Sequence, residues 1–221
     1  MKRALFSLSS GLLLASSAHA QLGVRVGGNT TLFTAREPTA NKNPATGRRL
    51  GYQVGLYYRV PLTKHLALVP EAQFSRETFH AEYTPSTPVG VIYIEGRPRT
   101  TYNQLLSYVN LPILLRASLG ALYLEAGPQL SLLVGGRADN GVTGNYLTVY
   151  EAATDSYRRF DAGPCVGVGV KLPAGFGVGL RAYWGLTKLT SDENYSPENR
   201  LYTGFQHRQS LQASLTYQLP G

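Results

Sequence analysis

Cysteine and long apolar runs are scarce in this sequence. Cys165 is the single cysteine, so no disulfide can form within the chain and the fold must hold without one. Beyond the first residues, no run of about 18 uncharged apolar residues occurs, which argues against a helical membrane protein. No helix-period segment with capping residues stands out either. These absences leave extended strands as the expected structural elements.

Motifs that carry known enzyme chemistry are also missing. The sequence has no H-E-x-x-H, no G-x-x-x-x-G-K-[ST] and no G-x-S-x-G. The glycine runs VGVGV and GFGVGL have the period of a strand and do not form a phosphate-binding turn before a helix. His65, His80 and His207 are far apart along the chain. We therefore predict no catalytic residue, no cofactor and no metal.

The first residues have the composition of an export signal. Lys2 and Arg3 precede an apolar core that runs from Leu5 to Ser17, and residues 18–20 read Ala-His-Ala, a small-residue cleavage site. This core is shorter than the roughly 20 residues that a permanent helical anchor needs. The next residue is Gln21, whereas a lipoprotein would have a cysteine there. We predict a cleaved secretory signal peptide at 1–20 and one exported domain at 21–221.

Acidic residues are fewer than basic ones, and the formal charge is +8. Removal of Lys2 and Arg3 with the signal peptide leaves 8 − 2 = +6. A basic balance can indicate a nucleic-acid partner, but an exported chain seldom meets one. Anionic lipid, lipopolysaccharide or another anionic glycan is the expected counterpart, and no nucleic acid is expected.

Two-faced strands recur along the whole chain. From 108 to 117 and again from 122 to 134, apolar and polar residues alternate with period two, as they do in an extended chain with one apolar face. The short stretch SLGA between these segments predicts a hairpin. The same pattern predicts eight strands in all: Leu22–Phe33, Tyr52–Val60, His65–Glu77, Asn103–Ala117, Leu122–Gly135, Arg159–Leu172, Phe176–Thr187 and Gln209–Leu219.

The connections between these strands are sorted by length. Short turns (PLTK, SLG and PAG) alternate with long segments, so an up-and-down arrangement puts all short turns at one end. Bacterial outer-membrane barrels have short periplasmic turns, long extracellular loops and an even number of strands. The sequence therefore predicts an all-β fold, an eight-stranded antiparallel up-and-down transmembrane β-barrel in the bacterial outer membrane. The long segments are 34–51, 78–102, 136–158 and 188–208.

One face of each strand is apolar, and the residues that define it include no charge. This face includes Leu56, Leu124, Val168 and Leu215. Contact with lipid explains the pattern, because Arg or Lys near the bilayer midplane costs about 2–4 kcal/mol. The alternative is that this face forms the core of a soluble sandwich or of a lipocalin-like binding barrel.

The other face is polar and rich in glycine, as expected for the lumen of a narrow barrel. Eight strands leave room only for side chains, and buried charges must be paired. We expect a ladder of Arg25, Arg59, Arg116 and Arg181 with Glu71, Glu125 and Asp161 to fill the lumen, with Lys171 also facing inward. Such a ladder closes the barrel to solutes. A charge-lined, narrow channel is the alternative.

Four motifs resemble those of the PorT-like family of outer-membrane β-barrel proteins. They are GLYYRVPLTKHLALVPEAQFS, SYVNLPILLR, YLEAGPQLSLLVGG and RFDAGPCVGVGV, and the likeness covers essentially the whole chain after residue 20. The resemblance implies an eight-stranded outer-membrane barrel, usually without an assigned biochemical activity. One named member of the family is tied to a protein-secretion apparatus. No catalytic residues come with the resemblance.

The expected function is therefore a structural or interaction role, with long extracellular loops and a plugged, polar lumen. Membrane lipid is one partner, and proteins of a secretion system are another candidate. An enzyme at the extracellular rim stays open as a less favoured alternative, assembled from a serine or from the titratable loop residues His80, Asp139, Asp155, Asp192 and His207. The Cys165 thiol is expected to be packed in the lumen and inert.

Overall fold

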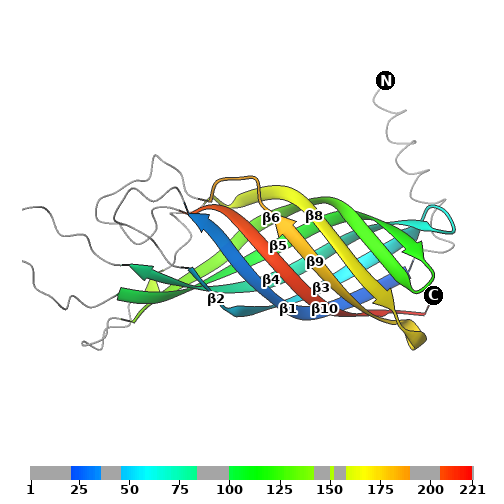
Figure 1. The fold of residues 1–221 in the computed structure, drawn as a ribbon, viewed down its shortest axis with the longest axis horizontal. Helices are drawn as coiled ribbons and strands as arrows, with labels where there is room; N and C mark the ends of the chain where they lie inside the picture. The colour runs from blue at the N-terminus through cyan, green and yellow to red at the C-terminus, as the bar shows by residue number, and fades with distance from the viewer. Residues whose placement is uncertain are drawn as a thin grey trace, which may run out of the picture.

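Eight antiparallel strands close into a barrel within the residues described by the computed structural model, 21–35, 46–83, 100–141, 150–151, 158–189 and 205–220. In ring order they are β1 (Gln21–Ala35), β3 (Leu50–Pro61), β4 (Leu66–Tyr83), β5 (Thr100–Leu119), β6 (Leu122–Gly141), β8 (Phe160–Lys171), β9 (Phe176–Trp184) and β10 (Phe205–Gln218). Strand β1 pairs with both β3 and β10, which closes the ring (Figure 1). The predicted fold class is confirmed. None of the described residues belongs to a helix long and apolar enough to cross a membrane.

Three neighbouring strands are longer than a membrane crossing requires. Strand β4 has 18 residues, and β5 and β6 have 20 each, whereas a transmembrane strand needs about 9–11 residues. Figure 1 shows them running past the rest of the wall at one end of the barrel. There the short strand β2 (Thr46–Arg48) pairs with β4, and β7 (Tyr150–Glu151) pairs with β6. The predicted strands end at Glu77, begin at Asn103 and end at Gly135, so they are too short. Strand pairing continues beyond these residues into polar sequence.

Three tight turns connect the strands at the opposite end of the barrel (Figure 1). Leu62–His65 joins β3 to β4, Gly120–Ala121 joins β5 to β6, and the 3-10 turn Pro173–Gly175 joins β8 to β9. Gly120 has φ +62°, a conformation that glycine adopts without the steric cost of a Cβ atom. The strand ends that lead into the longer connections all lie at the other end, as up-and-down topology requires.

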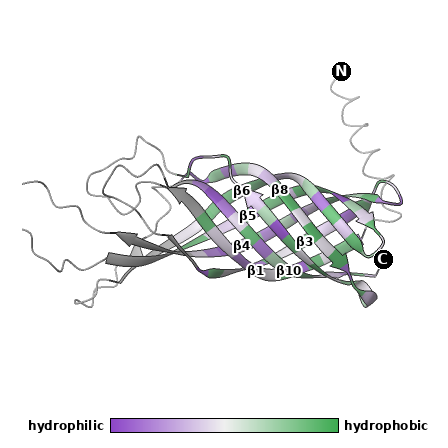
Figure 2. Ribbon diagram, viewed as in Figure 1, coloured by the Kyte–Doolittle hydropathy of each residue, from purple (hydrophilic) through white to green (hydrophobic). Residues whose placement is uncertain are grey.

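Side chains alternate between a packed interior and an exposed outer surface. On β3, Tyr57 is 3% exposed, whereas its neighbours Leu56 and Tyr58 are 56% and 41% exposed. Figure 2 shows the corresponding alternation of hydrophobic and hydrophilic residues along the strands. The interior is therefore the polar face and the outer surface is the apolar face. This arrangement is the inverse of a soluble barrel, whose apolar residues would lie inside.

The outer surface carries one arginine that the sequence-based interpretation left out. On β4, Ser75 and Glu77 are fully buried in the lumen, so Arg76 between them lies on the outer side of the wall. It pairs in register with Tyr52 of β3 and Ser107 of β5. The expectation of an uncharged outer face is wrong at this position. Arg76 lies within the predicted strand His65–Glu77, and alternation puts it on the same face as Phe74.

Candidate functional site

Five of the predicted lumen charges meet in one group in the half of the barrel nearer the tight turns. We call this group the lower ion-pair cluster. Its members come from five different strands, and each is almost completely buried. Alternation along each strand directs these side chains inward, and closure of the ring brings them together. The cluster consists of Arg25 (β1), Glu71 (β4), Arg116 (β5), Glu125 (β6) and Arg181 (β9).

Glu71 connects opposite walls of the barrel. The β4 and β9 strands are separated by β5, β6 and β8 on one side of the ring and by β3, β1 and β10 on the other. Nevertheless, Arg181 Nη1 of β9 donates to Glu71 Oε2 over 2.8 Å. The same oxygen accepts from Arg25 Nε at 3.1 Å. The cluster therefore spans the full width of the lumen.

Glu125 completes the cluster on the other side. Its Oε2 accepts from Arg116 Nε at 3.1 Å and Nη2 at 2.9 Å, and its Oε1 accepts from Arg181 Nε at 2.5 Å. Arg116 and Glu125 are register partners across the β5–β6 hairpin. Two carboxylates thus serve three arginines, and charge-assisted hydrogen bonds of this kind are among the stronger ones in proteins.

Aromatic rings and glycines adapt the wall to these long side chains. The Arg116 guanidinium lies 4.3 Å from the ring centroid of Tyr123 and 5.7 Å from that of Tyr57, within the range of cation–π attraction. A Cβ atom added at Gly167 would lie 2.9 Å from Arg181 Cγ and 2.9 Å from Glu125 Oε1. The glycine therefore leaves the space in which these two residues pair.

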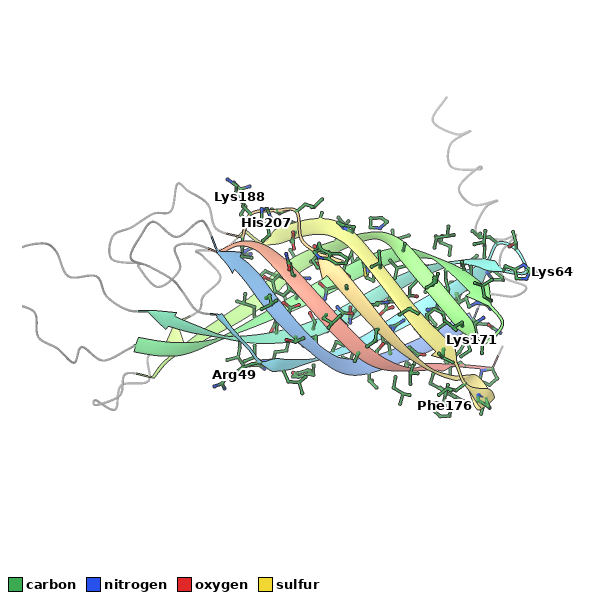
Figure 3. All side chains as sticks on the ribbon, viewed as in Figure 1. Arg49, Lys64, Lys171, Phe176, Lys188 and His207 are labelled. Carbon is green, nitrogen blue, oxygen red and sulfur yellow. The ribbon has the colours of Figure 1, made fainter. Side chains whose placement is uncertain are left out.

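Three other predicted lumen residues lie outside the lower ion-pair cluster. Arg59 Nη1 donates to Gln21 Oε1 at 3.1 Å, and Lys171 Nζ donates to Ser118 Oγ at 2.8 Å. Both contacts are partly buried and lie near the end with the tight turns, where Figure 3 shows Lys171. Asp161 is buried elsewhere in the lumen, so the predicted ladder is not one continuous chain of charges.

Asp161 belongs to a second group, nearer the end with the longer connections, which we call the upper ion-pair cluster. It consists of Glu77 (β4), Asp161 (β8) and Arg208 (β10). Arg208 Nη1 lies 3.8 Å from Glu77 Oε1, and Arg208 Nε lies 3.9 Å from Asp161 Oδ2. The guanidinium is also 4.1 Å and 4.7 Å from the ring centroids of Tyr108 and Tyr183. The Arg208 guanidinium therefore lies close to two carboxylates and to two aromatic rings.

The sequence-based prediction missed Arg208 and Glu77 as members of a charge cluster. Arg208 was assigned to the end of a long connection, but β10 begins at Phe205. The available signal was alternation, because Arg208 precedes the polar residues Ser210 and Gln212 of the same face with period two. Glu77 was assigned correctly to a strand, but its partner could not be identified without Arg208.

A neutral polar layer separates the two clusters. On β4, Gln73 and Ser75 lie between Glu71 and Glu77, and all four side chains are buried. Gln73 Nε2 donates to Gln212 Oε1 of β10 at 3.4 Å. Several amide atoms of this layer have no hydrogen-bond partner among the described residues, including both side-chain atoms of Gln53.

The described residues that were considered for other chemistry lie on several strands. Cys165 is fully buried against Leu114 and Tyr183. Of the five rim candidates for an enzyme, His80 and Asp139 both pair in register with Asn103 of β5, whereas His207 pairs with Thr34 of β1, away from them. The other two candidates, Asp155 and Asp192, lie outside the described residues. Among the residues that the structure describes, no group of three or more His, Cys, Asp or Glu could hold a metal ion.

Comparison with known proteins identifies the family. Residues 14–191 match the model of the outer membrane protein beta-barrel domain. The chain belongs to this outer-membrane β-barrel family. Its location is therefore the bacterial outer membrane, as predicted, and membrane lipid contacts the apolar outer face of the barrel. The match does not distinguish the PorT-like group, so that resemblance stays a prediction.

Solved structures that are similar to this outer-membrane barrel include three bacterial proteins. Neisserial surface protein A is 11% identical over 91% of this chain and 99% of its own, with a TM-score of 0.47. Ail of Yersinia pestis, solved in complex with the heparin analogue sucrose octasulfate, is 11% identical over 91% and 99%, with a TM-score of 0.45. OprG from Pseudomonas aeruginosa is 7% identical over 91% and 97%, with a TM-score of 0.43. A search of curated proteins gave no match.

Proposed function

We propose that this barrel is a plugged, non-enzymatic scaffold of the outer membrane that has a structural or interaction role. The observation that carries this proposal is the contact between Arg181 and Glu71, which joins opposite walls at 2.8 Å. Eight strands leave a lumen only just wide enough for side chains. A bond across the full width of such a lumen leaves little space for a solute, and the upper ion-pair cluster forms a second obstruction.

A narrow channel is the alternative that one observation favours. Amide atoms of Gln53, Gln73 and Gln212 in the neutral layer are buried without a partner among the described residues. Buried polar groups need hydrogen bonds, and water can supply them. Hydration of this layer would still leave the two ion-pair clusters in the path, which is why we prefer the plugged scaffold.

We expect the purified protein to show no steady single-channel current in a planar bilayer, because both clusters obstruct the lumen. The control combines Glu71→Ala and Arg181→Ala, which remove the contact across the lumen, with Arg208→Ala, which removes the arginine of the upper ion-pair cluster. Current from this variant would show that the method detects an opened barrel. Reproducible ohmic steps from the unaltered protein would contradict the plug and support the channel.

The interaction role is assigned to the end with the longer connections. There the long strands β4, β5 and β6 extend past the wall. Among the described residues of this end, the exposed charged side chains are basic: Arg49, Arg158, Arg159 and Lys188. All four carboxylates whose side chains are described, Glu71, Glu77, Glu125 and Asp161, lie in the lumen instead. These four basic side chains suit an anionic glycan or lipopolysaccharide.

This proposal requires the longer connections to face outside the cell. We therefore expect protease added to intact cells to cleave within 78–102 or 136–158, because these segments contain the connections from β4 to β5 and from β6 to β8. The measurement is the size of the fragments that remain in the membrane. Permeabilised cells serve as the control, since they expose both ends. Cleavage of intact cells confined to the tight turns at 61–64 or 173–175 would contradict this orientation.

Two narrower roles have separate tests. The PorT-like motifs favour an accessory role in a protein-secretion apparatus, and co-purification of secretion proteins with the tagged barrel would support it. An enzyme at the rim is less favoured, because His207 pairs with β1, away from His80 and Asp139. Turnover of lipid or peptide by the purified protein would identify such an activity and overturn the non-enzymatic role.

A further inference from the structure

Arg76 is a charged residue on the lipid-facing side of the wall. Its lumen-facing neighbours Ser75 and Glu77 are fully buried, and its register partners Tyr52 and Ser107 lie on the same outer face. The Arg76 Nε atom is buried and has no hydrogen-bond partner among the described residues. A buried N–H donor without a partner is unfavourable, so this position favours an acceptor from beyond the described residues.

The depth of Arg76 corresponds to a membrane boundary. Strand β4 begins at Leu66 directly after a tight turn, and Arg76 is ten residues further along. A tilted transmembrane strand crosses the hydrocarbon in about 9–11 residues. Arg76 therefore lies where the apolar band ends, at the side with the longer connections. Its register partner Tyr52 has an exposed ring, as is common for tyrosines at a membrane interface.

A second arginine, Arg49, lies between β2 and β3, the two strands that pair with β4 on either side of this position. Arg48 of β2 pairs with Phe79, and Tyr52 of β3 pairs with Arg76. Three residues, 49–51, therefore face two residues of β4, which is a β-bulge, and bulges redirect side chains. Arg49 in this bulge is exposed, and Figure 3 shows it projecting away from the wall at the end opposite to Lys64 and Phe176.

We infer that Arg76 and Arg49, flanked by Tyr52, bind a phosphate group of a lipid A-type glycolipid in the outer leaflet. Guanidinium groups hold phosphate through paired, charge-assisted hydrogen bonds. The four described carboxylates are enclosed in the lumen and cannot neutralise this pair from outside. A phosphate at the head-group level would neutralise both arginines at the depth where they lie. The inference rests on the proposed orientation, which brings this end of the barrel to the outer leaflet.

The test is binding of fluorescent lipid A to the folded protein in a non-ionic detergent. Detergent removes any dependence on orientation, so failure here is distinct from failure of the protease experiment on cells. We expect Arg76→Gln and Arg49→Gln each to weaken binding about tenfold, the loss of one charge-assisted interaction. Lys64→Gln, which removes the same charge at the opposite end of the barrel, should leave binding unchanged.

Two further ligands identify what is recognised. Lipid A stripped of its phosphates should not compete, and phosphatidylglycerol should compete at least about tenfold more weakly because its single phosphate is a diester with less charge. Equal binding by wild-type protein and by both arginine variants would overturn the site, and Arg76 would then only be reaching water. Equal competition by phosphatidylglycerol would overturn the assignment to a glycolipid. Retained heat-dependent gel mobility of each variant shows that the barrel is folded.

Discussion

Glu125→Leu should lower the free energy of unfolding by about 3–5 kcal/mol, because removing one member of a buried ion pair leaves its partners uncompensated. Glu125 accepts hydrogen bonds from Arg116 and Arg181, and Arg25 Nη2 lies 3.9 Å away. After the substitution, Glu71 would be the single carboxylate for three buried arginines of the lower ion-pair cluster. The measurement is urea unfolding of the protein in lipid vesicles.

Double substitutions test which arginine depends on Glu125. Glu125→Leu combined with Arg116→Leu should recover part of the loss, because the pair across the hairpin is then removed as a unit. Arg116 makes two hydrogen bonds to Glu125 and has no other carboxylate partner among the described residues, whereas Arg181 also bonds to Glu71. Recovery should therefore be greater with Arg116→Leu than with Arg181→Leu. The reverse order would contradict this division of partners.

The control for Glu125→Leu is its neighbour on the opposite face. Leu124 is 52% exposed on the outer surface, whereas Glu125 is 4% exposed in the lumen. Leu124→Arg places a charge against lipid nearer the tight turn than the midplane and should cost on the order of 1–3 kcal/mol. A harmless Leu124→Arg, together with labelling of position 125 by a lipid-phase probe, would invert the face assignment.

Arg208→Leu should also lower the free energy of unfolding by about 3–5 kcal/mol, because it leaves buried carboxylates without their cation. The affected groups are Glu77 and Asp161, and the rings of Tyr108 and Tyr183 lose their stacked guanidinium. Arg208→Lys should be intermediate, since lysine keeps the charge but lacks the planar fork. The measurement is the free energy of unfolding by urea in lipid vesicles, for the unaltered protein, Arg208→Leu and Arg208→Lys.

Gln209 provides the matched control for Arg208. It is the next residue of β10 and lies on the outer face, so Gln209→Leu should change stability by less than about 0.5 kcal/mol. The neutral layer separates the two clusters, so the losses from Arg208→Leu and Glu125→Leu should be additive to within about 0.5 kcal/mol. A loss below about 1 kcal/mol for Arg208→Leu would mean that the upper ion-pair cluster contributes little.

Local sequence was sufficient for the strands and their faces. Side chains of a strand alternate, so the apolar and polar periods separate Leu124 from Glu125 without knowledge of any neighbour. A tight turn also fixes hairpin register, which is why Arg116 could be expected opposite Glu125. Strand ends were less predictable, because β4, β5 and β6 continue into polar sequence by pairing with one another outside the membrane.

By itself, therefore, the sequence determined a barrel with a polar interior and eight strands, together with the faces of residues such as Leu124 and Glu125. Only the tertiary structure decided which charges meet. Arg181 and Glu71 are 110 residues apart and come from opposite walls, so their contact depends on the relative stagger of all the strands when the ring closes. The same closure separates Asp161 from the lower ion-pair cluster and places it beside Arg208. The alternation within one strand does not determine this stagger, because the stagger is the sum of the register offsets between all neighbouring strands of the barrel.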